Sequence, residues 1–232
     1  MVRRKDMNTT IRLFVCSLVA VVVFFSVLLL KRSDSLTDLP NIISESLDQA
    51  EVFIKTKVDP LACLTPRECP SDHFSFYVQS GAANIVLPKI CIQNRTVLGA
   101  VPGNGGVGLN IVVMDGRTGE ILKTGAFDMW GGDVQPLVDF LKAIEVGSVV
   151  LMASFDDPAT KLNEEARNLI ADLGSSLIQT LGFRDNWVFV GGKGESVKSN
   201  YEKTLKNERE HNKYEEWPEI IDLHGCIPQY LQ

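Results

Sequence analysis

The sequence predicts one α/β or α+β sandwich of about 170 residues, preceded by an N-terminal segment of different character. Residues 74–127 contain short runs in which apolar and polar residues alternate, as in strands with one buried face. Residues 133–190 combine helical spacing with continuous apolar runs, which indicates helices packed on buried strands. A chain of 232 residues that is 45% apolar is long enough for one well-buried domain and a smaller appendage.

The N-terminal segment has the pattern of a signal peptide or a signal-anchor. Arg3, Arg4, Lys5 and Arg12 precede eighteen uncharged residues, 13–30, which as a helix would roughly span a bilayer core. The run is longer than a usual cleavable segment, yet Ser33-Asp34-Ser35 offers a cleavage site just beyond it. The basic residues before the run predict a cytoplasmic N-terminus, with the remainder in the lumen. Residues 1–35 are assigned to this segment.

The charge balance and the cysteines agree with export. After residue 30 there are 19 basic and 28 acidic residues, a net charge of −9, which argues against nucleic acid as a partner. Apart from Cys16, the cysteines form an even set in an oxidising compartment, and two disulfides are the simplest account of it. These four cysteines are Cys63, Cys69, Cys91 and Cys226.

The elements of the domain can be expected in order. Residues 36–60 read as a stalk or propeptide linker with one weak helix near residues 43–55, because they lack the apolar residues needed to bury themselves. The domain, residues 61–232, then begins with a Cys-x5-Cys loop. Its first half is predicted to be antiparallel β-structure, with a glycine-bearing turn over residues 115–119 joining the last two strands into a hairpin. The predicted strands are 74–79, 84–92, 108–114 and 120–127.

The second half is expected to alternate helices with buried strands. Residues 133–144 and 163–173 carry apolar residues at helical spacing, and Gly174 is placed to end the second helix. Residues 148–154 form a continuous apolar run typical of a buried strand, and residues 187–190 form the last predicted strand. A polar tail follows, in which Cys226 reaches back to an earlier loop.

Two short polar motifs flank these buried strands and are candidate binding residues. Asp156-Asp157-Pro158 follows a strand, where ligands collect in mixed sheets, although Asp157 could instead cap the next turn. Two adjacent carboxylates could also hold Mg²⁺ or Mn²⁺ for glycosyl transfer, but no nucleotide-binding motif accompanies them. Arg184-Asp185, just before Trp187, could contribute to a site or could form a local ion pair beside core aromatic residues.

Three other motifs are candidates for ligand binding or glycosylation. Trp130 precedes two glycines that leave room for a sugar ring to stack on its indole, whereas Asp133 is a natural helix cap. Asn94-Arg95-Thr96 is an N-glycosylation sequon, expected at the surface. The pattern G-x-G-x-x-G over residues 103–108 precedes a strand rather than a helix and is interpreted as a flexible loop.

The sequence supports no catalytic or cofactor site. The three histidines are far apart and lack zinc-binding spacing, and no Gly-x-Ser-x-Gly motif occurs. We therefore expect no enzymatic activity, no metal and no cofactor.

Six blocks of sequence, in the same order, closely resemble the "family with sequence similarity three" group of secreted cytokine-like proteins. The resemblance runs from about Cys63 to Cys226, which is nearly the whole exported domain. The blocks are Ser80–Asn84, Gly108–Asn110, Phe127–Asp133, Asp156–Lys161, Gly182–Phe189 and Lys213–Pro218.

This resemblance implies a GG-type lectin domain, a β-β-α sandwich that also forms the stem module of the protein O-mannose β-1,2-N-acetylglucosaminyltransferase. In that relative an Asp after a central strand and the Arg of a Gly-aromatic-Arg-Asp motif contact carbohydrate. By the matching motifs these residues are Asp156 and Arg184 here. Trp130 or Trp187 would then supply an apolar face for a sugar ring.

The resemblance also implies the disulfides Cys63–Cys91 and Cys69–Cys226. A relative carries a cysteine where this chain has Val190, so a covalent dimer through that position is not expected. The resulting expectation is a secreted, extracellular, non-enzymatic signalling protein that binds a cell-surface receptor or glycan. The alternative is a type II Golgi membrane protein that serves as an accessory module or transferase in glycosylation.

Overall fold

The computed structural model describes residues 17–27, 59, 61–63, 68–194 and 198–229. The chain divides into two units, Met1–Val58 and Asp59–Gln232. In the first, residues 17–27 form a helix. Within the described ranges, no helix combines the length and the apolar character needed to cross a membrane. The predicted helix near residues 43–55 lies outside the described residues.

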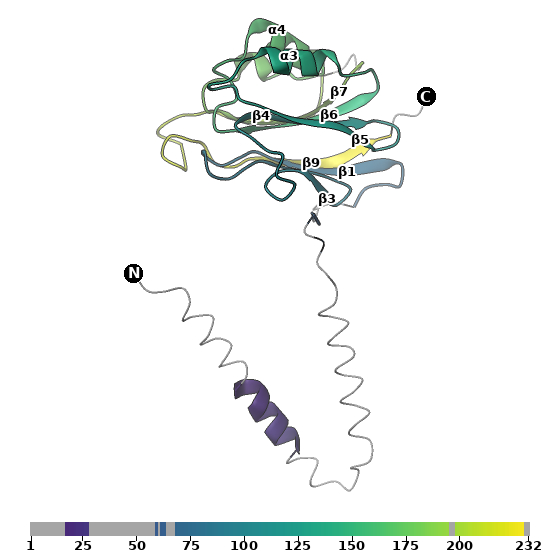
Figure 1. The fold of residues 1–232 in the computed structure, drawn as a ribbon, viewed down its shortest axis with the longest axis vertical. Helices are drawn as coiled ribbons and strands as arrows, with labels where there is room; N and C mark the ends of the chain where they lie inside the picture. Colours follow the sequence, from purple (N-terminus) through teal and green to yellow (C-terminus); the bar gives the residue numbers. More distant parts are fainter. Residues whose placement is uncertain (1–16, 28–58, 60, 64–67, 195–197, 230–232) are drawn as a thin grey trace. The chain divides into compact units, whose positions relative to one another are not determined.

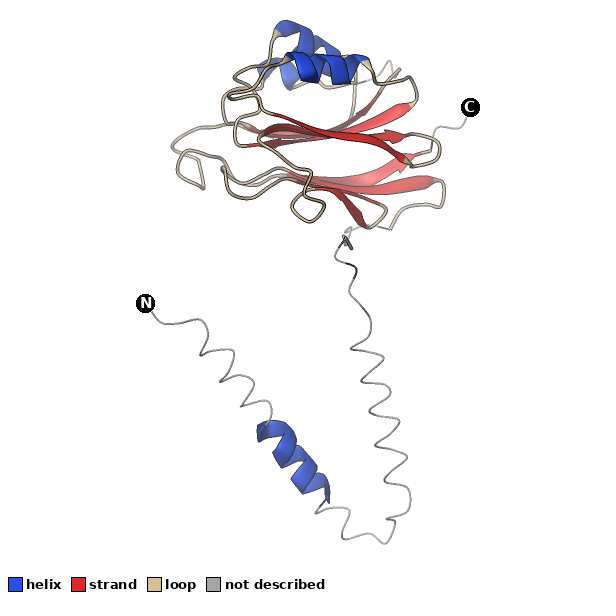
Figure 2. Ribbon diagram, in the orientation of Figure 1, coloured by secondary structure: helices blue, strands red, loops and turns tan. Residues whose placement is uncertain are grey.

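The second unit stacks three layers, a four-stranded sheet, a five-stranded sheet and a pair of helices (Figures 1 and 2). All neighbouring strands pair in the antiparallel sense. This arrangement confirms the α+β class and the β-β-α sandwich that the sequence and its resemblance predicted.

The first sheet has the strand order β3-β2-β1-β9. Every second residue of β1 is buried, so the sheet buries one face and leaves the other to solvent. Its inner face packs on the second sheet through a cluster that includes Phe74, Phe76 and Ile90. The strands are β1 (His73–Gln79), β2 (Lys89–Ile92), β3 (Arg95–Leu98) and β9 (Asp222–Pro228).

The second sheet has the order β5-β4-β6-β7-β8 and forms the middle layer. Its three central strands are covered on both faces, which explains why β4 and β6 read as continuous apolar runs. The predicted hairpin joins β4 to β5. The strands are β4 (Gly108–Asp115), β5 (Ile121–Phe127), β6 (Ser148–Phe155), β7 (Asn186–Gly192) and β8 (Tyr201–Leu205).

Helices α3 (Gln135–Lys142) and α4 (Glu164–Ala171) cover the outer face of this sheet, with the short 3₁₀ helix η1 (Ile178–Thr180) following them (Figure 1). The Asn163 side chain caps α4 by accepting a hydrogen bond from the Ala166 amide at 2.8 Å. The apolar faces of both helices join a second core cluster against β4, β6 and β7. Each face of the middle sheet therefore has its own core.

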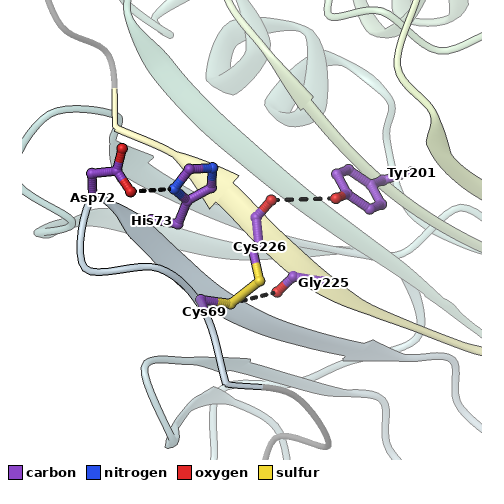
Figure 3. The surroundings of a disulfide bond; sticks show 6 residues. All are labelled: Cys69, Asp72, His73, Tyr201, Gly225 and Cys226. Atoms are coloured by element: carbon purple, nitrogen blue, oxygen red, sulfur yellow. Dashed lines mark hydrogen bonds and ion pairs between the residues drawn. A yellow bond between two sulfur atoms is a disulfide. The ribbon is translucent and has the colours of Figure 1, made fainter.

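Two disulfides tie the first sheet together. Cys63–Cys91 and Cys69–Cys226 are both formed, with Cα–Cα distances of 6.2 and 5.6 Å, and these are the pairings that the resemblance implied. Figure 3 shows Cys226 on β9, bonded to Cys69 in the segment before β1, while the Tyr201 hydroxyl donates to the Cys226 carbonyl oxygen at 3.2 Å. The second disulfide thus fixes the last strand to the beginning of the domain.

The observed strands differ from the predicted ones at three places. The strand predicted over 84–92 begins only at Lys89, because Ala82 and Val86 pair in a tight turn and Pro88 lacks an amide hydrogen for a ladder. The polar tail contains two strands that the pattern did not indicate, β8 and β9. The short strand β3 was missed as well.

Candidate functional site

The two polar motifs that flank the buried strands meet at one edge of the middle sheet. Strand β6 ends at Phe155 and its antiparallel neighbour β7 begins at Asn186, with Ala153 opposite Val188. Antiparallel pairing places the end of one strand beside the start of the next. Asp156-Asp157 and Arg184-Asp185 therefore lie side by side although 28 residues separate the first members.

The first residue of each motif, Asp156 or Arg184, faces outward and has unusual backbone geometry. Asp156 has φ of 59° and Arg184 has φ of 57°, so both lie in the left-handed region that costs a non-glycine residue roughly 1 kcal/mol. Arg184 Nε lies 4.0 Å from Asp156 Oδ1, and each side chain is 21% exposed. The fold thus brings together the two residues predicted to contact carbohydrate.

The buried side chain of Asp157 stabilises the turns that carry Asp156 and Arg184. The Asp157 side chain is buried, and its Oδ1 accepts hydrogen bonds from the backbone amides of Ala159 at 3.0 Å, Thr160 at 3.3 Å and Arg184 at 3.5 Å. It caps the turn after β6, as the alternative interpretation of this residue predicted, and it ties that turn to Arg184. Because Asp157 faces inward, the two adjacent carboxylates do not offer a common cation site.

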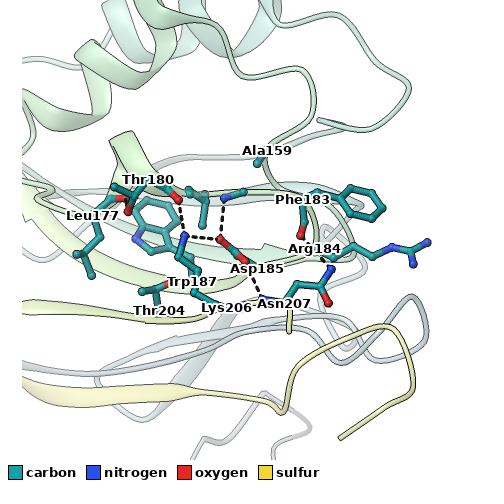
Figure 4. Close-up of polar contacts among 12 residues, drawn as sticks. Ala159, Leu177, Thr180, Phe183, Arg184, Asp185, Trp187, Thr204, Lys206 and Asn207 are labelled. Atoms are coloured by element: carbon teal, nitrogen blue, oxygen red, sulfur yellow. Dashed lines mark hydrogen bonds and ion pairs between the residues drawn. The ribbon is translucent and has the colours of Figure 1, made fainter. Parts of the chain in front are cut away.

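Asp185 stabilises the turn before β7 in a similar way. The Asp185 carboxylate accepts from the amides of Gly182 at 2.7 Å and Asn207 at 2.8 Å, and it forms an ion pair with Lys206 at 2.8 Å. Figure 4 shows Asp185 turned toward Lys206 and Asn207, with the Arg184 side chain directed away from it. The two residues do not form the local ion pair that was one interpretation of Arg184-Asp185.

Aromatic rings surround the Arg184 guanidinium. Its Cζ atom lies 4.7 Å from the ring centre of Phe183 and 4.0 Å from that of Trp217, distances at which a cation is attracted to a ring face. The Trp130 ring lies 5.7 Å from the Phe183 ring and is 55% exposed. Successive contacts thus link the four side chains in a row from Trp217 to the exposed indole of Trp130, the residue for which stacking on a sugar ring was one interpretation.

A hairpin turn over Tyr214–Trp217, which sequence reasoning did not place at the site, forms its other side. The Trp217 Nε1–H donates to Asp156 Oδ1 at 3.0 Å, and the Glu216 carboxylate forms an ion pair with Arg184. A second ion pair, Lys213–Glu219, closes the base of the hairpin and raises the pKa of Lys213. The signal for this contact in the sequence was the block Lys213–Pro218, which formed part of the resemblance.

Trp187 does not belong to the site. Its ring is fully buried, stacks on Phe189 with 5.5 Å between ring centres, and its Nε1–H donates to the Glu202 carboxylate at 2.9 Å. This placement corrects the expectation that Trp187 offers a face to a sugar. A Trp on a strand that is covered on both sides is a core residue.

Asn94 and Val190 lie elsewhere. Asn94 is exposed in the two-residue turn between β2 and β3, where φ is 48° at Gln93 and 63° at Asn94, as a tight hairpin requires. Val190 lines a mostly apolar cavity of about 330 Å³ together with Leu173 and Ile227. None of the residues lining that cavity belongs to the Asp156–Arg184 site.

The arrangement is suited to recognising hydroxyl groups. Asp156 is an acceptor, Arg184 is a fixed donor, and Trp130 adds a broad apolar surface within the same row of side chains. Among residues 17–27, 68–194 and 198–229, no group of three His, Cys, Asp or Glu side chains could hold a metal ion.

Comparison with known proteins gives consistent matches. The family model described as "Interleukin-like EMT inducer" matches residues 107–195, a range that includes Trp130, Asp156 and Arg184. The chain is 59% identical to Protein FAM3C of Danio rerio over 166 residues, which are 72% of this chain and 73% of that protein. It is 55% identical to Protein FAM3C of Homo sapiens over 174 residues, or 75% and 77% of the two chains. With Protein FAM3A of Mus musculus the identity is 49% over 167 residues, or 72% and 73%.

Proposed function

Because the chain belongs to the FAM3 family, whose model carries an interleukin-like description, we propose that it is a secreted, cytokine-like, non-enzymatic signalling protein that recognises carbohydrate. Its ligand is a glycan or the glycan of a glycoprotein receptor. Asp156 accepts hydrogen bonds from sugar hydroxyls, Arg184 donates to them, and Trp130 packs against a ring.

The observation that carries this proposal is the convergence of Asp156 and Arg184 at neighbouring strand ends. Both residues adopt left-handed backbone conformations, and Asp157 and Asp185 hold the two turns through buried hydrogen bonds. Strained residues that the surrounding structure holds firmly are typical of ligand sites. A rigid pair of one donor and one acceptor matches the vicinal hydroxyls of a sugar.

A glycan array with the purified protein tests the proposal. We expect binding to at least one glycan, and we expect Asp156→Asn and Arg184→Gln each to weaken it at least tenfold. Asn adopts the left-handed conformation readily, so the first variant removes a charge with little backbone strain. Glu210→Gln, an exposed change in the loop before the Tyr214–Trp217 hairpin, is the control. Absence of binding above background, or full binding by both site variants, would contradict the proposal.

Secretion is tested separately. Mass spectrometry of conditioned medium should find a mature chain that begins near Leu36, just after Ser33-Asp34-Ser35. A protein absent from the medium and attached to the lumenal face of a Golgi membrane would favour the type II alternative. The same spectra should show a glycan on Asn94 that is lost in Asn94→Gln, because the β2–β3 turn exposes this residue.

A further inference from the structure

The Glu216 carboxylate occupies the place on Arg184 that an acidic ligand would need. Glu216 and Arg184 form an ion pair, and Asp156 lies on the other side of the guanidinium, with Oδ1 4.0 Å from Nε. One positive group therefore faces two negative groups. Glu216 is 68% exposed, whereas Arg184 is 21% exposed, so Glu216 is the more solvent-exposed member of the ion pair.

Part of the Asp156–Arg184 pair is not bonded to any other described residue. Asp156 Oδ2 and Arg184 Nη2 make no hydrogen bond to another residue in the described parts of the chain. A sugar hydroxyl can donate to the first and another can accept from the second without displacing Glu216. The guanidinium lies over the rings of both Trp217 and Phe183, so Arg184 cannot turn to meet a ligand elsewhere without losing these contacts.

A ligand carboxylate or sulfate meets two obstacles. It must compete with Glu216, which the same chain holds at a high effective concentration near Arg184. It also approaches Asp156, and like charges brought together at a binding surface reduce affinity. An exposed ion pair is weak by itself, but here a neighbouring carboxylate opposes any anionic replacement.

We infer that Glu216 is a specificity-determining residue that makes the Asp156–Arg184 site select neutral glycans over acidic ones. The inference rests on the proposed carbohydrate binding at this site and adds the class of ligand. Glu216 offsets the positive charge of the guanidinium, which lowers its attraction for anions, and leaves the N–H groups of Nη2 for hydroxyl oxygens.

Glu215 provides a matched control. It is the neighbouring residue, it is exposed, and its side chain makes no ion pair with any described residue. Glu215→Gln removes the same formal charge from the same turn without freeing Arg184. A general effect of net charge would alter both variants equally, whereas direct occupation of Arg184 would alter only Glu216→Gln.

The experiment measures binding of the purified protein to an array of matched probes, namely galactose with galacturonic acid, glucose with glucuronic acid, and lactose with sialyllactose. In each pair that the wild-type protein binds, its affinity for the neutral probe should exceed its affinity for the acidic probe by at least tenfold. Glu216→Gln should narrow that preference to threefold or less, Glu215→Gln should keep it, and the three proteins should unfold at similar temperatures. Raising the ionic strength should also narrow the wild-type preference.

The outcomes separate this inference from the proposed function. Equal or tighter binding of the acidic probes by the wild-type protein would overturn the inference and leave carbohydrate binding in place. The inference would also be overturned if Glu216→Gln kept the wild-type preference for neutral probes, or if Glu216→Gln and Glu215→Gln lost that preference equally. Binding to no member of the full glycan array by any of the three proteins would overturn the proposed function together with the inference.

Discussion

At the residue scale, neighbouring residues in the two polar motifs have different roles: the first residue of each motif lies at the candidate site, and the second supports the turn that carries it. Asp156 and Arg184 present their side chains at the surface cluster, whereas Asp157 and Asp185 turn inward and accept backbone hydrogen bonds. The carboxylates of Asp157 and Asp185 thus fix the turns from which the other two project. Similar residue types at adjacent positions should therefore respond differently to substitution.

Asp157→Ala should destabilise the protein far more than Asp156→Asn. The first change removes the acceptor of three amide hydrogens, one in a buried hydrogen bond and two in partly buried ones. Each unsatisfied buried group costs about 1–3 kcal/mol, so a loss of about 2 kcal/mol is expected. Asp156→Asn keeps an oxygen that can accept the hydrogen bond from Trp217. It also suits the left-handed backbone at this position, because Asn adopts that conformation readily. Urea unfolding of both variants checks this, and equal losses of stability would show that Asp157 is not the support described.

The sequence indicated the site residues better than their partners. Asp156 and Arg184 could be predicted because each lies next to a recognisable buried strand and within a block of the resemblance. The sequence left open whether Trp187 is a core residue or faces a sugar, because a short run over 187–190 does not reveal how many layers cover a strand. The Trp217 and Glu216 contacts depend on a turn 61 residues from Asp156, and no periodicity reports such a long-range contact.

At the element scale, the apolar pattern predicted the central strands of the middle sheet and both of its helices, whereas the edge strands β8 and β9 were not predicted. Strands β4, β6 and β7 are buried on both faces and their composition is distinctive. Strands β8 and β9 mix polar and apolar residues because they are exposed on one side, so the pattern resembled a polar tail. Pairing with β7 and β1 stabilises them, and only the folded chain supplies those neighbours.

The two disulfides should contribute unequally to stability. They close separations of 28 residues for Cys63–Cys91 and 157 residues for Cys69–Cys226. Taken separately, the loss of entropy in the unfolded chain corresponds to about 3.6 and about 5.1 kcal/mol, so replacing the second pair with serines should be more damaging by about 1–2 kcal/mol. Denaturant unfolding of the two double-serine variants measures the difference, and a larger loss for the first pair would contradict the chain-entropy explanation.

At the scale of the whole molecule, the unit from Asp59 to Gln232 combines two cores with a site at the edge of their shared sheet. The middle sheet is fixed from both sides, by the helices on one face and by the disulfide-linked sheet on the other (Figure 2). This arrangement gives Asp156 and Arg184 a rigid base, which favours binding without a large rearrangement. The class of the fold could be predicted from the sequence, and the β-β-α layering followed from the resemblance.

The three tryptophans allow the proposed carbohydrate binding at Asp156 and Arg184 to be tested directly in one spectrum. Trp130 and Trp217 lie in the row of side chains around Arg184, whereas Trp187 is fully buried and its indole N–H is bonded to Glu202. Two-dimensional ¹H–¹⁵N NMR resolves the three indole signals, which single Trp→Phe variants assign. On titration with a glycan from the array, we expect the Trp130 and Trp217 signals to move and the Trp187 signal to stay in place. Movement of Trp187 alone, or no movement of Trp130 and Trp217 at saturating glycan, would contradict a carbohydrate site built on Asp156 and Arg184.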